Sequence, residues 1–307
     1  MYFALGAIVA SAAAVSRVAV PGAVLQAEAQ LEGAVQAAAS GAVSDVPSTL
    51  GVFALAVLQG VTEFLPVSSS GHLALGRAAI GIREGGLALD VALHVGTLFA
   101  IIVAFRRDVL RLLGDLVQGK LSMWIWLVVA TIPVCIVGLT FKDTIEEAGA
   151  GTRGAAYGLF LTAAALLVGE MMRKRRERAP FPDDDPSLID AAVMGCAQAV
   201  AVWPGVSRSG STISMGFARG KSPQEAARLS FLMSLPAISG AAILECPGAL
   251  EEGFGGIAPG VVLAAAAVAG LVGFAALKTL LIVLRKGSFP WFAAYCASLG
   301  TLALLFG

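Results

Sequence analysis

Six long apolar segments constrain the fold of this chain more than any other feature. Each is close to the roughly 20 apolar residues that a helix needs to cross the hydrocarbon core of a bilayer. The chain is 57% hydrophobic and only 14% charged, with a mean hydropathy of +0.83, whereas a soluble domain is about 25% charged. This composition excludes an ordinary soluble or disordered chain and predicts an all-α integral membrane protein. The predicted transmembrane helices are residues 87–105, 121–141, 154–172, 229–245, 259–284 and 289–307.

Two further apolar stretches run into residues that stop a helix. Residues 49–67 lead into the sequence PVSSSGH, and residues 188–203 lead into PGVSRSGST. Proline, glycine and clustered hydroxyl residues end helices. Neither stretch is therefore predicted to cross the membrane as a single helix.

The placement of the charges predicts the orientation of the spans. The 21 basic and 21 acidic side chains cancel, and a net charge of zero gives no sign of nucleic-acid binding. Basic residues nevertheless follow the first, third and fifth spans, and basic loops stay in the cytoplasm. These basic residues are Arg106, Arg107, Arg111, Lys120, the run RKRRER at 173–178, Arg285 and Lys286.

This orientation makes both interrupted stretches re-entrant. Residues 188 and 229 both begin on the cytoplasmic side, so the chain between them must enter and leave the membrane by one face, as a helical hairpin. By the same parity the first hairpin, residues 49–83, enters from the outside. Non-helical backbone at membrane depth is tolerated only where it is buried in protein or lines a wet cavity. We therefore expect the polar tips of both hairpins inside the protein.

An internal repeat supports this arrangement. At a separation of 139 residues, Gln59 aligns with Gln198, Ser68 with Ser207, Ser70 with Ser209, and Gly71 with Gly210. Each half of the membrane domain, about 49–172 and 188–307, then holds one hairpin and three spans, and an odd number of spans inverts the second half. Inverted repeats place sites near the midplane at the repeat interface. Residues 1–48 form an N-terminal extension, for which a signal sequence, an anchor and a misassigned start stay open.

The two polar tips place ionisable residues where burial is most unfavourable, which marks a functional site. Arg208 presents a planar fork of donors that suits a phosphate, and the hydroxyl- and glycine-rich helix starts suit an anion. Glu63 suits a metal ligand or general base, and His72 suits proton transfer near neutral pH. A serine beside such a base can act as a nucleophile. The tips therefore predict phosphoryl transfer or hydrolysis on a lipid-borne phosphate.

Structural roles compete with these functions. Serine, threonine and glycine often serve only close packing of membrane helices, and Glu63 with Arg208 can form a purely structural ion pair. His94 stands alone in a predicted span, where a hydrogen-bonded structural role is favoured over a functional one. Hydrogen bonding across the hairpins is the structural alternative for Gln59 and Gln198.

The tip motifs resemble the two signatures of the undecaprenyl-diphosphate phosphatase family, also called bacitracin-resistance proteins. The first signature, [E/Q]-x-x-x-E before a proline- and serine-rich turn ending in histidine, matches Gln59 to Glu63 and then PVSSSGH up to His72. The second, P-G-x-S-R-S-x-x-T, matches Pro204 to Thr212. Both motifs are long and occur in the expected order, and the resemblance extends from about residue 52 to the C-terminus.

The resemblance implies an enzyme of the bacterial inner membrane that hydrolyses undecaprenyl diphosphate to undecaprenyl phosphate and inorganic phosphate. This step recycles the lipid carrier for peptidoglycan synthesis, and it gives resistance because bacitracin sequesters the diphosphate. The family depends on a divalent cation, expected here as Mg²⁺ or Ca²⁺, and its cavity opens toward the periplasm. The expected partners are the polyprenyl diphosphate and membrane lipids, with no nucleic acid and with a homodimer left open.

By motif position, the resemblance also implies roles for single residues. Glu63 is expected as the acid–base or metal-associated carboxylate, and Arg208 as the clamp that stabilises charge during transfer. Ser69 precedes His72 by three residues and is the expected nucleophile, with direct attack by water as the alternative. A glutamine at the first motif position weakens any arrangement that needs two metal-binding carboxylates. The expected phosphate-binding residues are Gln59, Ser68, Ser207, Ser209 and Thr212.

A transporter or flippase for the lipid carrier is the alternative function, because inverted repeats with broken helices are a transporter architecture. The clustered nucleophile, acid–base groups and arginine favour chemistry, since a flippase has less use for Glu63 beside His72. A structural membrane scaffold leaves Glu63 and Arg208 unexplained.

Overall fold

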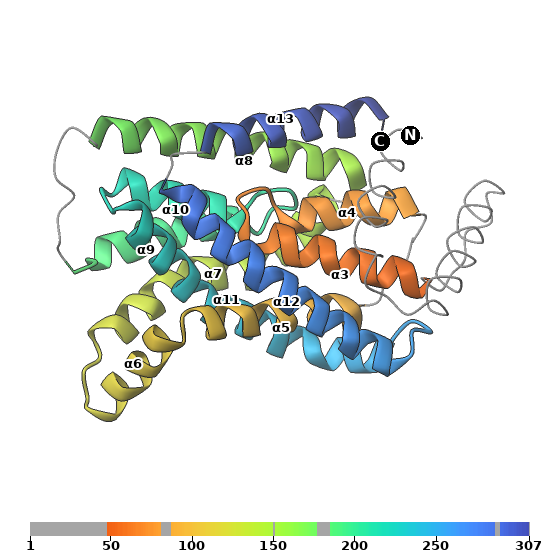
Figure 1. The fold of residues 1–307 in the computed structure, drawn as a ribbon, viewed down its shortest axis with the longest axis horizontal. Helices are drawn as coiled ribbons and strands as arrows, with labels where there is room; N and C mark the ends of the chain where they lie inside the picture. The colour runs from red at the N-terminus through yellow and green to blue at the C-terminus, as the bar shows by residue number, and fades with distance from the viewer. Residues whose placement is uncertain (1–47, 81–86, 150, 177–184, 286–288, 307) are drawn as a thin grey trace.

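The computed structural model describes residues 48–80, 87–149, 151–176, 185–285 and 289–306, and these residues are helical with no strand (Figure 1). Except for Ser48, the N-terminal extension lies outside the described residues. The helices are α3 (Thr49–Phe64), α4 (Ser69–Ile80), α5 (Leu87–Ala104), α6 (Arg106–Val117), α7 (Ser122–Gly149), α8 (Gly151–Arg176), α9 (Leu188–Val200), α10 (Arg208–Ala218), α11 (Pro223–Glu252), α12 (Pro259–Leu284) and α13 (Phe289–Phe306).

Six of these helices are long and apolar enough to cross a membrane: α5, α7, α8, α11, α12 and α13. They coincide with the six predicted spans, so the protein is a multi-pass helical membrane protein. The predicted start of α11 at residue 229 is too late. The hydroxyl of Ser222 accepts a hydrogen bond from the Glu225 N–H at 3.2 Å, and Pro223 follows the cap. A serine cap followed by proline is a strong helix start, and it lies outside the apolar window.

The basic segment after the first span was expected as a loop, and this expectation is wrong, because residues 106–117 form helix α6. Leu110 is exposed on this helix while Leu112 is buried. Arg228 Nε on α11 lies 2.7 Å from Asp108 Oδ1, and Trp124 Nε1 donates to the Leu112 carbonyl at 2.8 Å. A basic amphipathic helix of this kind is typical of a membrane interface.

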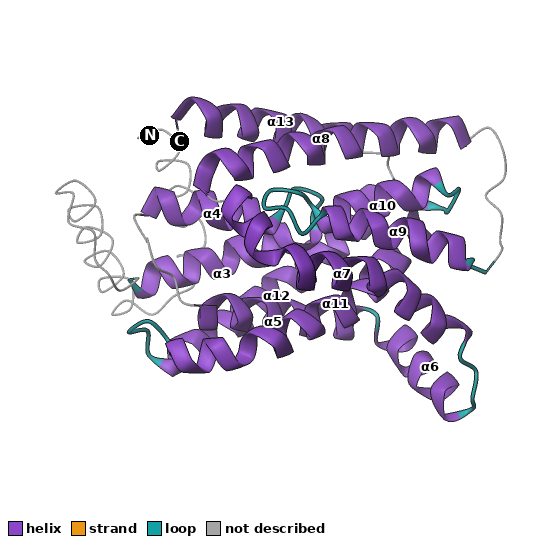
Figure 2. Ribbon diagram, turned by 180° about the vertical axis from the view of Figure 1, so that it is seen from behind, coloured by secondary structure: helices purple, strands orange, loops and turns teal. Residues whose placement is uncertain are grey.

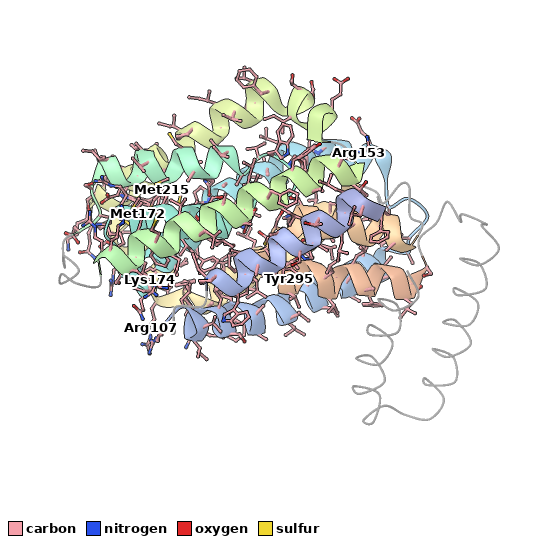
Figure 3. All side chains as sticks on the ribbon, turned by 90° about the horizontal axis from the view of Figure 1, so that it is seen from above. Arg107, Arg153, Met172, Lys174, Met215 and Tyr295 are labelled. Carbon is pink, nitrogen blue, oxygen red and sulfur yellow. The ribbon has the colours of Figure 1, made fainter. Side chains whose placement is uncertain are left out.

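Basic side chains gather at one end of the helix bundle. Arg107 and Lys174 lie at this end, whereas Arg153 lies at the opposite end (Figure 3). Lys221, which precedes α11, forms an ion pair of 3.0 Å with Asp190 at the start of α9. The end that carries α6 and the start of α9 is therefore the basic end.

Two pairs of short helices, α3 with α4 and α9 with α10, enter the bundle from opposite ends (Figures 1 and 2). Their connecting turns, residues 65–68 and 201–207, meet near the middle of the molecule. Helix α3 packs against α12 and α9 packs against α7, while α8 and α13 lie side by side. Within this packing residues 66–68 of the first turn and 205–207 of the second are buried, whereas residues 201–204 are half-buried.

The end of α3 is anchored by close packing. The ring of Phe64 is buried and contacts Phe231 of α11 edge-on, with 5.8 Å between centroids. A Cβ atom on Gly60 would lie 2.7 Å from the Ala269 carbonyl of α12, so the two helices touch backbone to backbone. The position of Glu63, next to Phe64, is therefore set by rigid packing.

Candidate active site

Each polar turn ends in a serine that caps the following helix. Ser68 Oγ accepts a hydrogen bond from the Gly71 N–H at 3.2 Å, and Ser207 Oγ accepts one from the Gly210 N–H at 3.1 Å. Each cap satisfies one of the first N–H groups of its helix. Ser68 also has a φ of +70°, an unfavourable conformation for a residue other than glycine that clusters at functional sites.

The two turns are in direct contact with each other. The Gly205 N–H donates to Ser70 Oγ at 3.3 Å. Gly205 has a φ of +87°, and a Cβ atom there would lie 2.1 Å from the Ala155 carbonyl of α8. A Cβ atom on Gly71 would lie 3.0 Å from Gly205 Cα. The two turns therefore need glycine where they meet, and side chains from both can act on one ligand.

Glu63 lies at the centre of this contact. It is buried, and its Oε1 forms an ion pair with Arg208 Nη2 across the two turns. Its Oε2 accepts hydrogen bonds from Ser69 Oγ at 2.6 Å and from Gln59 Nε2 at 3.1 Å. The structure thus brings together four predicted site residues from α3, α4 and α10. A carboxylate within hydrogen-bond reach of a serine hydroxyl can accept its proton.

Arg208 has one paired and one unpaired terminal nitrogen. Nη2 contacts Glu63, whereas Nη1 is buried without a hydrogen-bond partner. A buried donor without a partner is unfavourable, and a guanidinium readily donates two parallel hydrogen bonds to a phosphate. Arg208 is also the first residue of α10, where the helix dipole favours an anion. The free donor and the helix start together fit a bound phosphate.

His72 lies beside this group but has different partners from those expected. Its Nδ1 lies 2.7 Å from the Ser68 carbonyl oxygen, and its Nε2 lies 2.7 Å from Tyr295 Oη. The two rings stack with an interplanar angle of 11°, and Tyr295 comes from α13 (Figure 3). Tyr295 has no motif around it, so only the tertiary structure identifies it. The base within hydrogen-bond reach of Ser69 is Glu63.

His94 on α5 also reaches the site. Its Nδ1 lies 2.8 Å from the Asp90 carbonyl oxygen, which is the expected structural hydrogen bond. Its Nε2, however, lies 3.8 Å from Glu63 Oε2. The polar residues Asp90, His94 and Thr97 are spaced to share one face of a helix, which is the one sequence signal that could have drawn attention to His94.

The hydroxyls of Ser207, Ser209 and Thr212 in the second tip are buried and already engaged. Ser209 Oγ donates to the Leu65 carbonyl at 3.2 Å, and the hydroxyls of Thr212 and Ser230 lie 2.6 Å apart. Ser207 Oγ caps α10 and lies 3.3 Å from Ser209 Oγ. In this structure the predicted phosphate-binding residues Ser207, Ser209 and Thr212 hold the tip together.

Two serines of the first tip are more accessible. Ser69 is half-buried and Ser70 is exposed, whereas Ser68 is buried. Ser68 Oγ and Ser70 Oγ lie 3.2 Å apart. Ser70 was not among the predicted site residues, although it is the most accessible of the three hydroxyls.

The donor set fits a divalent cation that is shared with a substrate. No group of three or more histidine, cysteine, aspartate or glutamate side chains suited to a metal occurs within the described parts of the chain. Gln59 Oε1 is nevertheless buried without a partner, and Gln59 Nε2 contacts Glu63. Mg²⁺ is commonly held by one or two protein oxygens, with water and substrate phosphates completing the shell. Gln59 and Glu63 provide such a pair of residues.

The fold defines a polytopic membrane protein, and its two polar turns bring a carboxylate, a serine hydroxyl and an arginine together inside the helix bundle. The sequence matches the family described as bacitracin resistance protein BacA over residues 52–302, a range that includes every residue of the site. The chain belongs to this family.

Relatives in three organisms carry the name undecaprenyl-diphosphatase. The protein of Rubrobacter xylanophilus is 37% identical over 260 residues, covering 81% of this chain and 94% of the relative. That of Methanosphaera stadtmanae is 36% identical, covering 83% and 97%. That of Carboxydothermus hydrogenoformans is 35% identical, covering 82% and 94%. The similarity therefore spans nearly the whole length of each relative.

Proposed function

We propose that this protein hydrolyses undecaprenyl diphosphate to undecaprenyl phosphate and inorganic phosphate. The reaction recycles the lipid carrier for peptidoglycan synthesis and confers bacitracin resistance. Family membership and the names of the relatives support this function. The observation that carries it is the free donor Arg208 Nη1, buried beside the Glu63–Ser69 hydrogen bond.

The chemistry follows from these contacts. Ser69 Oγ attacks the terminal phosphorus while Glu63 Oε2, at 2.6 Å, accepts the hydroxyl proton. The bond from this phosphorus to the bridging oxygen breaks, and undecaprenyl phosphate leaves with that oxygen. Water then hydrolyses the phosphoserine, which releases inorganic phosphate and restores the hydroxyl. Arg208 stabilises the charge on the transferring group. The proton that Glu63 accepted passes to the leaving phosphate oxygen, and His72, whose ring nitrogens contact the Ser68 carbonyl and the Tyr295 hydroxyl, is proposed to hold the Ser68 turn in place.

A divalent cation, Mg²⁺ or Ca²⁺, is proposed to be held by Glu63 and Gln59 together with oxygens of the diphosphate. When bound, it neutralises the charge of the diphosphate. The unpartnered Gln59 Oε1 supports this proposal, because a buried amide oxygen without a partner is itself unfavourable.

The membrane arrangement that we propose is an inverted repeat with two re-entrant hairpins in the bacterial inner membrane. Three observations support this arrangement. Serine caps begin both α4 and α10, and α3 packs on α12 as α9 packs on α7. The helix pairs α3/α4 and α9/α10 enter the bundle from opposite ends (Figure 1). The pair α3/α4 enters from the end opposite the basic residues. Because basic ends face the cytoplasm, the cavity is proposed to open toward the periplasm.

The test measures phosphate release from undecaprenyl diphosphate by the purified full-length protein in detergent with added Mg²⁺ or Ca²⁺. Glu63→Gln is expected to lose activity, because it removes the proton acceptor of Ser69. Glu225→Gln is the matched control, since Glu225 pairs with Arg228 at 3.0 Å on α11 and touches no site residue. A folded wild-type protein that releases no phosphate under these conditions would overturn the proposed function.

A further inference from the structure

The imidazole of His94 is held in an orientation that leaves one ring nitrogen available. Its Nδ1 lies 2.8 Å from the Asp90 carbonyl oxygen, so the proton of a neutral ring sits on Nδ1. Asp90 is in turn fixed by an ion pair with Arg77 of α4. The lone pair of a neutral imidazole is then on Nε2. Metal-binding histidines show this pattern, in which the other ring N–H donates to a backbone carbonyl or a carboxylate.

The free nitrogen points toward oxygens of the site. His94 Nε2 lies 3.8 Å from Glu63 Oε2, a separation that one bound cation can bridge with bonds of about 2.0–2.2 Å to each atom. Gln59 also contacts Glu63 Oε2, at 3.1 Å through Nε2, while its Oε1 has no partner. A half-turn of the Gln59 amide presents Oε1 to the same point. One imidazole nitrogen, one carboxylate oxygen and one amide oxygen therefore converge there.

The second histidine of the chain cannot serve in this way. His72 has both ring nitrogens in hydrogen bonds, to the Ser68 carbonyl and to the Tyr295 hydroxyl. Arg208 occupies the other carboxylate oxygen of Glu63. Oε2 accepts from Ser69 Oγ and Gln59 Nε2, so a cation bound there takes the place of the Gln59 N–H. The two histidines are thus in contrasting states, one fully engaged and one with a nitrogen facing a carboxylate.

We propose that His94 Nε2 is a direct ligand of a divalent cation, in a site completed by Glu63 Oε2 and Gln59 Oε1. This rests on the proposed function, because the same cation would bind the diphosphate. Imidazole is a preferred ligand of transition-metal ions, whereas Ca²⁺ takes oxygen ligands. Mn²⁺ takes carboxylate and amide oxygens as Mg²⁺ does and, as a transition-metal ion, also accepts an imidazole nitrogen, so it is a suitable probe of this site.

The test is Mn²⁺ binding to the full-length protein without substrate, followed by electron paramagnetic resonance. The protein is purified through a tag that contains no histidine, in a detergent without phosphate or amine groups. The wild type is expected to show spin-echo modulation from a coordinated imidazole nitrogen. His94→Gln, which offers an oxygen in place of nitrogen, is expected to lose this modulation, and His72→Gln is expected to keep it.

Affinity provides a second measurement. His94→Leu is expected to weaken Mn²⁺ binding by more than about tenfold. Loss of a residue that only hydrogen-bonds to a metal ligand already weakens metal binding by about 10–100-fold, so loss of a direct ligand should exceed the lower value. Nitrogen modulation that persists in His94→Gln, or that is absent from the wild type, would overturn the proposal, as would unchanged affinity in His94→Leu. Phosphate release by a wild type without nitrogen modulation would reject the ligand role of His94 and leave the proposed function standing.

Discussion

Removal of the Arg208 side chain separates the catalytic and structural roles of the central ion pair. Arg208→Ala deletes the free donor Nη1 and also leaves Glu63 without its charged partner. An arginine that stabilises phosphoryl transfer contributes about 10³–10⁵ in rate, and a single oxyanion donor about 10²–10³. Because Arg208 also binds the ground state, we expect kcat/KM to fall about 10³-fold, which corresponds to about 4 kcal/mol.

The structural effect of the same change has a different origin. Glu63 is 6% exposed, and removal of one partner of a buried ion pair costs about 3–5 kcal/mol. Glu63 keeps its hydrogen bonds from Ser69 and Gln59. We therefore expect the free energy of unfolding to fall by an amount near the lower end of this range, about 3 kcal/mol. The double variant Arg208→Ala/Glu63→Gln removes the unpaired charge and is expected to recover most of this stability.

The assay combines phosphate release with thermal unfolding of the wild type, the single variant and the double variant. The double variant is expected to unfold near the wild-type temperature and to remain inactive. Two results would refute the reasoning. One is an Arg208→Ala protein within tenfold of wild-type activity. The other is recovery of activity together with stability in the double variant, which would mean that the arginine acts only on folding.

Three further changes test neighbouring parts of the site. Ser69→Ala is expected to lower kcat by more than about 10³-fold and Ser70→Ala by less than tenfold; substantial turnover in Ser69→Ala would favour direct attack by water. Tyr295→Phe removes the hydrogen bond to the site histidine on α4 and is expected to lower the unfolding free energy by about 1 kcal/mol, so an unchanged melting temperature would argue against that contact. Gly205→Ala places a Cβ atom 2.1 Å from a backbone oxygen at a residue with positive φ. It is expected to lower the free energy of unfolding by about 2–5 kcal/mol. The control is Gly138→Ala, where a Cβ atom meets nothing within 4 Å.

Patterns with strong local physics were predictable from the sequence. A run of about 20 apolar residues has one stable form in a bilayer, because every backbone group must be paired within the segment. The six spans were therefore predicted and are confirmed. Helix α6 was missed because a basic segment between spans resembles a loop unless its leucines are counted at helical spacing. The late start predicted for α11 has a related cause, since the cap at Ser222 is polar.

The site shows where local patterns stop being informative. Glu63, Ser69, His72 and Arg208 stand out as polar residues beside helix-stopping turns in an apolar chain. Their partners do not stand out. Spacing along α4 favoured Ser69 with His72, whereas the packed structure places Ser69 on Glu63 and His72 on Tyr295. A partner more than two hundred residues away in sequence depends on how α13 packs against the hairpin, which no local pattern encodes.

The sequence by itself determined that this chain spans a membrane six times, that two polar turns interrupt it, and that these turns carry one carboxylate, one histidine and one arginine. Burial of such groups is unfavourable, so their presence predicts a site. Only the tertiary structure decided which atoms face one another. It left one nitrogen of Arg208 free, brought His94 to Glu63 from α5, and engaged most hydroxyls of the second tip in packing. The physical reason is that hydropathy acts along the chain, whereas hydrogen bonds and ion pairs depend on the distances that helix packing sets.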